Sequence, residues 1–268
     1  MITYPNTKIN LGLHVRFKRE DGFHEIDSVF YPVQWCDALE VCKAENGITS
    51  SFSGLKIGGD SKDNLIEKAF NLIAVDHSLS GITYHLDKMI PMGAGLGGGS
   101  SDAAFAIEMI NECFDLNLDP KELNHYAAQL GSDINFFLEN KPARCSGRGE
   151  IVIPIEFSLK GMFIALINPN IHISTKESYS GVYKEDRLID LDRMKKEGVH
   201  SWKEFLVNDF EQSVFKVAPE IKDLKESLYN QGAVYASMTG SGSTVYGLFE
   251  EKPDIKTPYE QFWVGRLE

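Results

Sequence analysis

Few cysteines, no long apolar run and no signal-like start limit what this chain can be. It has 268 residues and only four cysteines, which form no C-x-x-C pair and no plausible disulfide framework. This usage favours a reduced, cytoplasmic location. No apolar run approaches the length of a membrane span, and residues 1–6 lack the basic and apolar regions of a signal peptide. We therefore expect no membrane partner.

Positive charge is also scarce. Lysine and arginine together number 27 against 39 aspartates and glutamates, which gives a formal net charge of −12. This balance disfavours nucleic acid or an anionic membrane as a partner. A small phosphorylated ligand stays possible, because it needs only a local basic pocket. The hydrophobic content of 43% and the charged content of 25% are ordinary for a globular protein, and the length suits one large or two medium domains.

Glycine, in contrast, is concentrated in residues 91–104, which read P-M-G-A-G-L-G-G-G-S-S-D-A-A. Glycine tolerates positive φ and lets a ligand approach the main chain closely. A serine at the N-cap of the following helix would leave backbone N–H groups pointing outward at the positive end of the helix dipole. We therefore expect Ser100 and Ser101 to begin a helix whose N-terminus binds a phosphate.

Three other interpretations of this glycine-rich loop fit less well. A Walker A loop requires a lysine before the terminal serine or threonine, and Ser100 follows Gly99 directly. Residues 93–98 match G-x-G-x-x-G, but a dinucleotide fold requires a strand after the helix, and the chain continues with a second helix that begins at Pro120. A flexible linker would not lead straight into an alanine-rich amphipathic helix.

Hydrophobic periodicity along the rest of the chain predicts a mixture of helices and strands, so the fold class is α+β. A domain boundary near residues 156–161 is plausible. We expect helices at 65–75 (capped by residues 63–64), 101–114, 120–130, 174–183, 202–207 and 221–231. We expect strands within 8–42, a strand pair at 48–57, and strands at 82–86, 151–155, 162–167, 233–238 and 244–249.

Two polar positions each allow a structural and a functional interpretation. Lys8 and Asn10 share one face of a predicted strand, and taken alone that face would be solvated. Asp133 follows a helix that ends at Gly131. Taken alone it would be an N-cap, whereas the functional alternative is a carboxylate at the mouth of a pocket.

Two loops are similarly open to interpretation. Residues 21–24 begin as a hairpin turn and bring Phe23 beside His24, which is compatible with a surface turn or with a binding position. Residues 238–244 read M-T-G-S-G-S-T. This loop is richer in glycine and serine than a tight hairpin requires, so it either connects two strands or admits a ligand.

The order of these motifs along the chain resembles that of the GHMP kinase superfamily. The chain contains K-I-N-L, G-F-H-E, D-N-L-I, the glycine-rich loop, G-S-D-x-x-F-F-L, S-x-R-G-E, N-D-F-E and M-T-G-S-G-S-T in succession. The K-I-N-L, G-F-H-E and D-N-L-I motifs and the short length are similar to the branch that phosphorylates cytidine diphosphate methylerythritol in non-mevalonate isoprenoid biosynthesis. The resemblance implies a two-domain fold, with residues 1–156 and 157–268 as N- and C-terminal GHMP domains and the active site in the cleft between them.

The resemblance also implies roles for residues at matching positions. Lys8 and Asp133 match the catalytic pair, with Asp133 as general base and Lys8 orienting it. ATP, accompanied by Mg²⁺, would be bound by Asn64, Leu65, Lys88, Pro91, Met92, Gly93, Ala94, Gly95, Leu96, Gly97, Gly98, Gly99, Ser100 and Ser101. The substrate would be bound by Asn10, Phe23, His24, Thr175, Tyr179, Gly240 and Ser241, with Phe23 and Tyr179 on the two faces of the cytosine.

Some positions depart from the family pattern, and other functions stay open. Thr7, Ser132 and Asn135 replace residues that the family usually has, and the last two affect the geometry after Asp133. We expect a monomer or homodimer without its own protein-built metal site. The alternatives are another GHMP kinase, of the mevalonate or homoserine type, and a GHMP-fold protein that binds nucleotide without catalysis.

Overall fold

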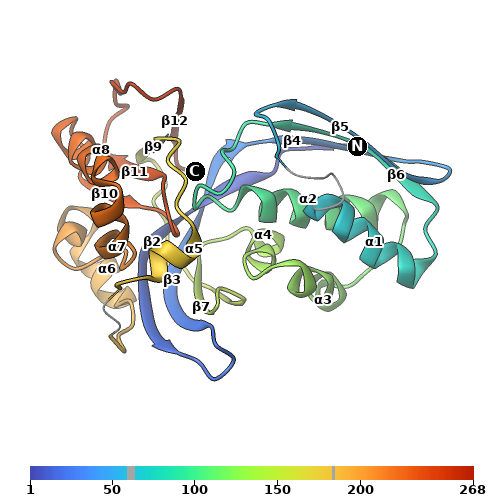
Figure 1. The fold of residues 1–268 in the computed structure, drawn as a ribbon, viewed down its shortest axis with the longest axis horizontal. Coiled ribbons are helices and arrows are strands. Elements are labelled where there is room, and N and C mark those ends of the chain that lie inside the picture. The colour runs from blue at the N-terminus through green and yellow to red at the C-terminus, as the bar shows by residue number, and fades with distance from the viewer. Residues whose placement is uncertain (59–63, 183–184) are drawn as a thin grey trace. The chain divides into compact units, whose positions relative to one another are not determined.

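A computed structural model describes residues 1–58, 64–182 and 185–268. The chain divides into two compact units (Figure 1). Unit 1 comprises residues 1–7, 35–92 and 97–141, and unit 2 comprises residues 8–34, 93–96 and 142–268. Neither unit is one continuous segment, and the domain division at residues 156 and 157 stays a prediction. In the described ranges, no helix has the length and apolar character needed to cross a bilayer.

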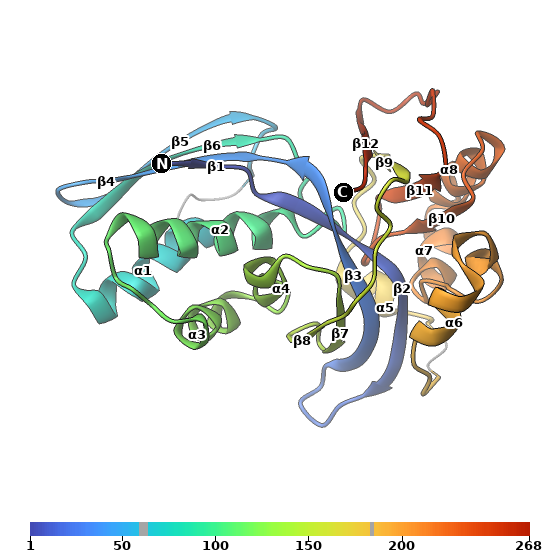
Figure 2. The same cartoon turned by 180° about the vertical axis from the view of Figure 1, so that it is seen from behind.

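Unit 1 is a sheet covered by helices. Its strands, in spatial order, are β1 (Ile2–Thr3), β4 (Ala38–Lys43), β6 (Gly81–Lys88) and β5 (Gly47–Gly54). Its helices are α1 (Leu65–His77), α2 (Gly98–Cys113), α3 (Pro120–Leu130) and α4 (Ile134–Glu139). All four helices lie on one face of the sheet (Figures 1 and 2). Helix α2 packs against β4, α1 and α4.

Unit 2 contains two sheets and the remaining helices. One sheet has the order β2 (Asn6–Lys18), β3 (His24–Cys36), β7 (Ala143–Gly147), β8 (Ile151–Pro154). The other has the order β10 (Tyr235–Met238), β11 (Val245–Phe249), β9 (Phe163–Asn168), β12 (Gln261–Arg266). The helices are α5 (Thr175–Tyr179), α6 (Leu191–Glu197), the 3-10 helix η2 (Val199–Glu204), α7 (Glu211–Val217) and α8 (Pro219–Asn230). The core contains Leu13 and Val15 of β2 together with apolar residues of α7, α8 and the second sheet.

The helices with clear end signals lie where the sequence predicts them. Asn64 caps α1, since its side-chain oxygen accepts a hydrogen bond from the N–H of Ile66 at 2.9 Å; Asp63, the other expected cap residue, lies outside the described residues. Helix α3 begins with a capping box between Asp119 and Glu122, and Gly131 is its C-cap. These signals are local hydrogen bonds, which explains why sequence alone finds them.

Other predictions are wrong in detail. Residues 48–57 do not form a strand pair, because β5 is one strand that pairs in parallel with β6 along its whole length. The N-cap of α2 is Gly97, with φ +72°, and not a serine. Ser100 and Ser101 therefore lie inside the first turn. Residues 202–207 lie largely in η2 and the turn that follows it. The sequence analysis did not predict α4, α6 or α7.

Candidate active site

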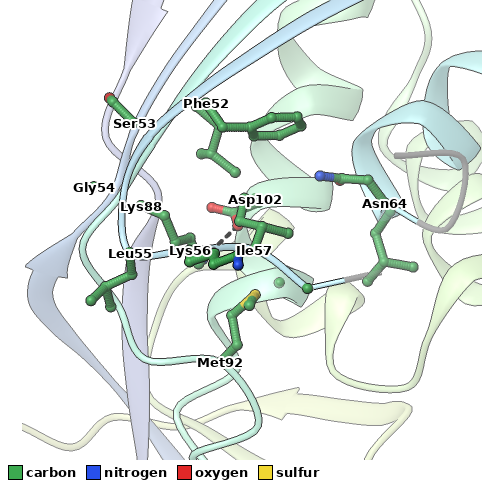
Figure 3. Close-up of a pocket in the computed structure, with 14 residues that line it drawn as sticks. Phe52, Ser53, Gly54, Leu55, Lys56, Ile57, Asn64, Lys88, Met92 and Asp102 are labelled. Carbon is green, nitrogen blue, oxygen red and sulfur yellow. Dashed lines mark hydrogen bonds and ion pairs between the residues drawn. The ribbon is translucent and has the colours of Figure 1, made fainter. Parts of the chain in front are cut away.

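Unit 1 contains a cavity of about 630 Å³ beside the start of α2 (Figure 3). A cavity of this size suits a nucleotide or another drug-sized ligand. Five of the predicted ATP-binding residues line it, namely Asn64, Leu65, Lys88, Met92 and Gly99. The remaining lining residues are Phe52, Ser53, Gly54, Leu55, Lys56, Ile57, Gly58, Leu86 and Asp102. The wall from residues 52–58, which belongs to β5 and the loop after it, has no counterpart among the predicted site residues.

The first turn of α2, whose Gly99 lines this cavity, contains backbone donors that have no partner within the helix. The N–H of Ser101 donates to the carbonyl of Gly97 at 2.9 Å, so the N–H groups of Gly98, Gly99 and Ser100 precede the first hydrogen bond of the helix. Three such donors at the positive end of a helix dipole form an anion site. The structure thus places the cap at Gly97 rather than at a serine, and the N-terminus of the helix still offers these three donors.

Gly98 has a packing role rather than a conformational one. A Cβ atom at this position would lie 2.9 Å from Cγ2 of Ile90 and 3.1 Å from Nζ of Lys88. Its backbone is ordinary helix, whereas the neighbouring Gly97 has positive φ. Gly98 therefore lets α2 begin against the end of β6, where any side chain would push the helix away.

Asn64 has one side-chain atom to offer a nucleotide. Its oxygen is used to cap α1, and in Figure 3 its side-chain nitrogen points toward the cavity. This amide nitrogen can only donate, so a ring nitrogen of a base is the kind of partner it fits.

Lys88 lines the cavity, but its ammonium group is held by two carboxylates. Lys88 is 1% exposed, and its Nζ bonds to Oδ2 of Asp37 and, at 2.7 Å, to Oδ2 of Asp102. Oδ1 of Asp37 accepts the N–H groups of Met89 and Ile90 at 2.6 and 2.7 Å. Lys88 thus links the end of β6 to α2. The sequence analysis assigned Lys88 to the nucleotide site and did not predict this structural role.

Burial shifts the protonation of this cluster. Burial and, to a lesser extent, the neighbouring charge of Asp37 raise the pKa of Asp102 to about 7, although the charge of Lys88 lowers it. Burial alone would lower the pKa of Lys88, but Asp102 and Asp37 raise it above its ordinary value. Oδ1 of Asp102 is buried and has no hydrogen-bond partner within the described part of the chain. The cluster therefore contains a firmly charged lysine and a carboxyl group that titrates near neutral pH.

In unit 2, Lys8 and Asn10 lie in the interior of β2. Lys8 is 3% exposed and Asn10 is fully buried, so the interpretation of this face as solvated is wrong. Nζ of Lys8 donates to Oδ1 of Asn10 at 2.7 Å and lies 4.3 Å from the centre of the Phe30 ring. Nδ2 of Asn10 donates to the hydroxyl of Ser28 at 2.8 Å. A buried cation and an amide are therefore held rigidly on one strand.

The two glycine-rich segments meet inside unit 2. Gly95 has φ +77°, and a Cβ atom there would lie 2.1 Å from the carbonyl oxygen of Thr239. The hydroxyl of Thr239 bonds to the carbonyl of Gly95 at 3.2 Å, and the N–H of Thr244 donates to Ala94 at 3.3 Å. The N–H of Gly240 donates to Oδ1 of Asn10 at 2.9 Å. The loop at 239–244 is thus both a hairpin connection and a neighbour of Asn10.

The predicted pyrimidine-binding residues also gather in unit 2. The rings of His24 and Tyr179 are stacked, with centroids 4.6 Å apart and planes inclined by 17°. Phe23 is 53% exposed, and the guanidinium of Arg148 lies 4.8 Å from the centre of its ring. The ring of Tyr179 therefore faces that of His24. Thr175 is exposed at the first position of α5.

Ser241 belongs to the same region, because the hydroxyl of Ser178 donates to its carbonyl oxygen at 2.9 Å. Among the other predicted residues, the backbone carbonyl of Leu96 accepts the N–H of Lys8 at 3.1 Å. Pro91, Ala94 and Leu96 are buried, and Gly93 is exposed with φ +63°. These four residues shape the path of the loop.

Asp133 occupies the N-cap position of α4 in unit 1, but its side chain makes no capping hydrogen bond. Its φ and ψ of −85° and −7° are helical rather than extended, which places the carboxylate away from the cap geometry. The hydroxyl of Ser132 bonds to its Oδ1 at 3.3 Å. Asp133 therefore occupies the N-cap position that the sequence predicts, but its side chain does not make the hydrogen bond of a cap.

Sequence reasoning missed Asp37, Asp102, Asn208 and Thr239. Asp102 directly follows Ser101 in the glycine-rich motif, and Asn208 begins N-D-F-E, so both were quoted without a role. Nothing in the sequence near Asp37 indicates that it pairs with a lysine 51 positions later. In the described ranges, no group of three or more histidine, cysteine, aspartate or glutamate residues is arranged to hold a metal ion. All four cysteines are free thiols.

Two family models match the chain. The GHMP kinases N terminal domain matches residues 64–139, and the GHMP kinases C terminal domain matches residues 191–262. The first covers α1 to α4, and with them the first turn of α2 and Asp133.

Individual proteins match over nearly the whole chain. A 4-diphosphocytidyl-2-C-methyl-D-erythritol kinase of Bacteroides thetaiotaomicron is 49% identical over 253 residues, which are 93% of this chain and 92% of that protein. The crystal structure of a 4-(cytidine 5'-diphospho)-2C-methyl-D-erythritol kinase has a TM-score of 0.83 at 28% identity and covers 100% of this chain and 99% of its own. The structure of mevalonate kinase from L. major, with a TM-score of 0.67 at 15% identity over 94% of this chain and 87% of its own, shares the fold alone.

Proposed function

The chain belongs to the 4-diphosphocytidyl-2-C-methyl-D-erythritol kinases, a family of GHMP kinases, and we propose that it transfers the γ-phosphoryl group of ATP to the 2-hydroxyl group of that substrate. The observation that carries this proposal is the 49% identity to a kinase of this name across almost the full length of both chains. The reaction belongs to non-mevalonate isoprenoid biosynthesis. The protein is therefore a small-molecule phosphotransferase with an alcohol as acceptor.

ATP occupies the cavity of unit 1 in this proposal. The free N–H groups of Gly98, Gly99 and Ser100 bind phosphate oxygens, and the side-chain nitrogen of Asn64 donates to the base. Phe52, Leu65 and Met92 line the same cavity and supply apolar contact for the adenine. Lys88 contributes to the nucleotide site as part of the cavity wall and not as a direct phosphate contact, because its ammonium group is bound by Asp37 and Asp102.

Asp133 is the general base in this mechanism. The 2-hydroxyl oxygen attacks the γ-phosphorus, the bond to the β,γ-bridging oxygen breaks, ADP leaves, and the hydroxyl proton passes to the carboxylate of Asp133. Proton transfer can occur late, because the transition state of phosphoryl transfer is loose and the enzyme contributes mainly position and charge. The place of Asp133 within the matched GHMP kinases N terminal domain supports this role. Lys8 supplies a fixed positive charge that orients the carboxylate and the hydroxyl.

The cytidine end of the substrate binds in unit 2. Phe23 and Tyr179 stack on the pyrimidine, and the main chain at His24 reads its edge. Asn10, Thr175, Gly240 and Ser241 contact the remaining groups. The exposure of Phe23 supports its part in this arrangement, whereas the face of Tyr179 that stacks on His24 must separate from it before a base can bind there. The placement of the whole active site between two domains stays a prediction, as do the cytoplasmic location and the choice between monomer and homodimer.

Mg²⁺ fits this site as an ion that arrives with the nucleotide. Mg²⁺ in kinases keeps several waters and is held by substrate phosphates and one or two protein oxygens, so the lack of an acidic cluster among the described residues is compatible with it. The hydroxyl of Ser101 is buried without a hydrogen-bond partner in the described ranges, and it is the protein oxygen that best fits the ion. When bound, Mg²⁺ neutralises phosphate charge.

A coupled assay for ADP release, run with and without the cytidylyl substrate, tests the function. We expect substrate-dependent ADP formation and a phosphorylated product, whereas mevalonate and homoserine should give only background turnover. Equal turnover with either of these alcohols would favour another GHMP kinase. ATP binding without turnover of any of the three would favour a nucleotide sensor.

A further inference from the structure

The N-D-F-E segment at residues 208–211, just before and at the start of α7, has no role in the mechanism above. Asn208 is 1% exposed, and its side chain uses all of its hydrogen-bonding groups within unit 2. Nδ2 donates to the carbonyl of Met238 at 2.8 Å and to that of Gly240 at 2.9 Å. Oδ1 accepts the N–H of Phe210 at 3.0 Å. One amide group therefore fixes the two carbonyls on either side of Thr239.

The other side of Gly240 faces Asn10. The N–H of Gly240 donates to Oδ1 of Asn10, and the same oxygen accepts Nζ of Lys8 at 2.7 Å and the hydroxyl of Thr239 at 3.1 Å. A continuous series of hydrogen bonds thus leads from Asn208 through Gly240 and Asn10 to the ammonium group of Lys8. Asn208, Thr239, Asn10 and Lys8 are each 3% exposed or less, so water does not compete for these bonds.

Gly240 is the residue of this series with the most conformational freedom. Its φ of +55° is open to glycine but strained for other residues, so its own conformational preference does not hold the peptide in place. Glu211 anchors the preceding residues, since its Oε1 accepts the N–H of Met238 at 2.8 Å. Beyond Met238, Asn208 is the side chain that restrains the carbonyl of Gly240 among the described hydrogen bonds.

We propose that Asn208 is a positioning residue for the kinase reaction, because it fixes the Gly240 peptide and, through Asn10, the ammonium group of Lys8. The inference rests on the proposed function for its effect on turnover. Loss of the two carbonyl contacts frees Gly240 to rotate and removes one of the three donors that hold Oδ1 of Asn10, so the hydrogen bond from Nζ of Lys8 to that oxygen loses part of its support. A misplacement of about 1 Å lowers a reaction rate by about 10²-fold. Nucleotide binding in unit 1 needs none of these contacts.

The test compares Asn208→Asp with Asn168→Asp. The first keeps the shape of the side chain and removes its two donors. The control residue Asn168 is also buried, at 4% exposure, and its Nδ2 donates to the hydroxyl of Thr244 at 3.2 Å, at the other end of the same loop. We expect Asn208→Asp to lower kcat about 10²-fold with the KM for ATP changed by less than about 3-fold. Asn168→Asp should keep kcat within about 3-fold even if it lowers Tm as much.

A double-mutant cycle with Lys8→Met separates positioning from general damage. If Asn208 acts through Lys8, adding Asn208→Asp to Lys8→Met should lower the residual kcat by less than about 3-fold. Full multiplication of the two losses, or a kcat of the folded Asn208→Asp variant within about 3-fold of wild type, would overturn the proposal. If Asn208→Asp does not fold, Asn208→Ala, which introduces no charge, replaces it in the same cycle.

A crystal structure of the Asn208→Asp variant tests this inference independently of the proposed function. If the wild type does not phosphorylate the cytidylyl substrate, the proposed function fails, and the structure still tests the positions. We expect the N–H of Gly240 to move out of hydrogen-bond distance of Asn10 and Nζ of Lys8 to shift. Unchanged positions of both atoms would contradict a positioning role for Asn208.

Discussion

Replacing Lys88 by methionine is the sharpest test of the cavity in unit 1. The substitution keeps the apolar stem of the side chain and leaves Asp37 and Asp102, which are 1% and 4% exposed, without their shared cation. Removing one partner of a buried ion pair typically lowers stability by about 3–5 kcal/mol. We expect a value near the lower end, about 3 kcal/mol, because Asp102 can neutralise itself by binding a proton.

The pH dependence follows from Asp102. Its pKa is raised from 3.8 to about 7 in the folded protein, so between these values the folded state binds more protons than the unfolded state, and stability falls as pH rises. Above pH 7 the wild-type carboxyl is ionised and this contribution levels off. Without Lys88 the pKa of Asp102 rises further, so the deficit of the variant should grow by up to about 1.4 kcal/mol per pH unit above 7.

Thermal unfolding in metal-free, nucleotide-free buffer measures both effects. For proteins of roughly this size a loss of about 1 kcal/mol lowers Tm by about 2–4 °C, so we expect a decrease of about 6–12 °C at pH 7 and a larger one at pH 8.5. Adding Asp102→Asn, which removes the titrating charge, should restore part of the loss and abolish its increase at high pH. Stability within about 1 kcal/mol of wild type at both pH values, together with a large loss of ATP affinity, would refute this reasoning and make Lys88 a direct nucleotide contact.

Three further predictions concern turnover and specificity. Asp133→Asn should lower kcat about 10²–10⁴-fold while a nonhydrolysable ATP analogue binds as before; a near wild-type kcat would exclude Asp133 as the base. Gly95→Ala should lower both Tm and kcat, because its Cβ would lie 2.1 Å from the carbonyl oxygen of Thr239; an unperturbed folded variant would show that the two glycine loops do not pack as described. The wild type should prefer the cytidine substrate to its uridine counterpart by at least about 10² in kcat/KM, since two mismatched buried polar groups lose about 1–3 kcal/mol each. His24→Ala should keep most of this preference if the main chain reads the base, and equal use of both nucleotides would contradict cytosine recognition.

Local signals account for the parts of the fold that sequence predicts well. Asn64, Asp119 and Gly131 mark the ends of α1 and α3 through hydrogen bonds within a few residues of each cap. The sequence wrongly predicts a strand pair at residues 48–57, and the cause lies elsewhere in the chain. This segment is one strand, β5, which pairs in parallel with β6 from Gly47 opposite Gly81 to Gly54 opposite Lys88. A parallel partner leaves no turn signal beside the strand that it stabilises.

The start of α2 shows how packing overrides local preference. Glycine is a poor helix former and serine a good cap, so the sequence predicts a helix that begins at the serines. A Cβ at Gly98 would lie 2.9 Å from Cγ2 of Ile90, so glycine at this first helical position lets the helix lie against the end of β6 without displacing that side chain. The helix therefore begins within the glycine run, at Gly97.

The same reasoning explains which candidate site residues the sequence singles out and which it misses. Lys8, Asp133 and the glycine-rich loop carry motifs that are recognisable in a few consecutive residues. Asp37 and Asn208 contact groups 51 and 32 positions away in the chain, Nζ of Lys88 and the carbonyl of Gly240. Nothing near Asp37 in the sequence indicates its partner, and the N-D-F-E motif that begins at Asn208 does not indicate which group Asn208 binds. Residues that touch a ligand must match its chemistry and so form short motifs, whereas residues that hold them need only one buried hydrogen-bonding group in the right place. The fold supplies that place, and only the structure reveals it.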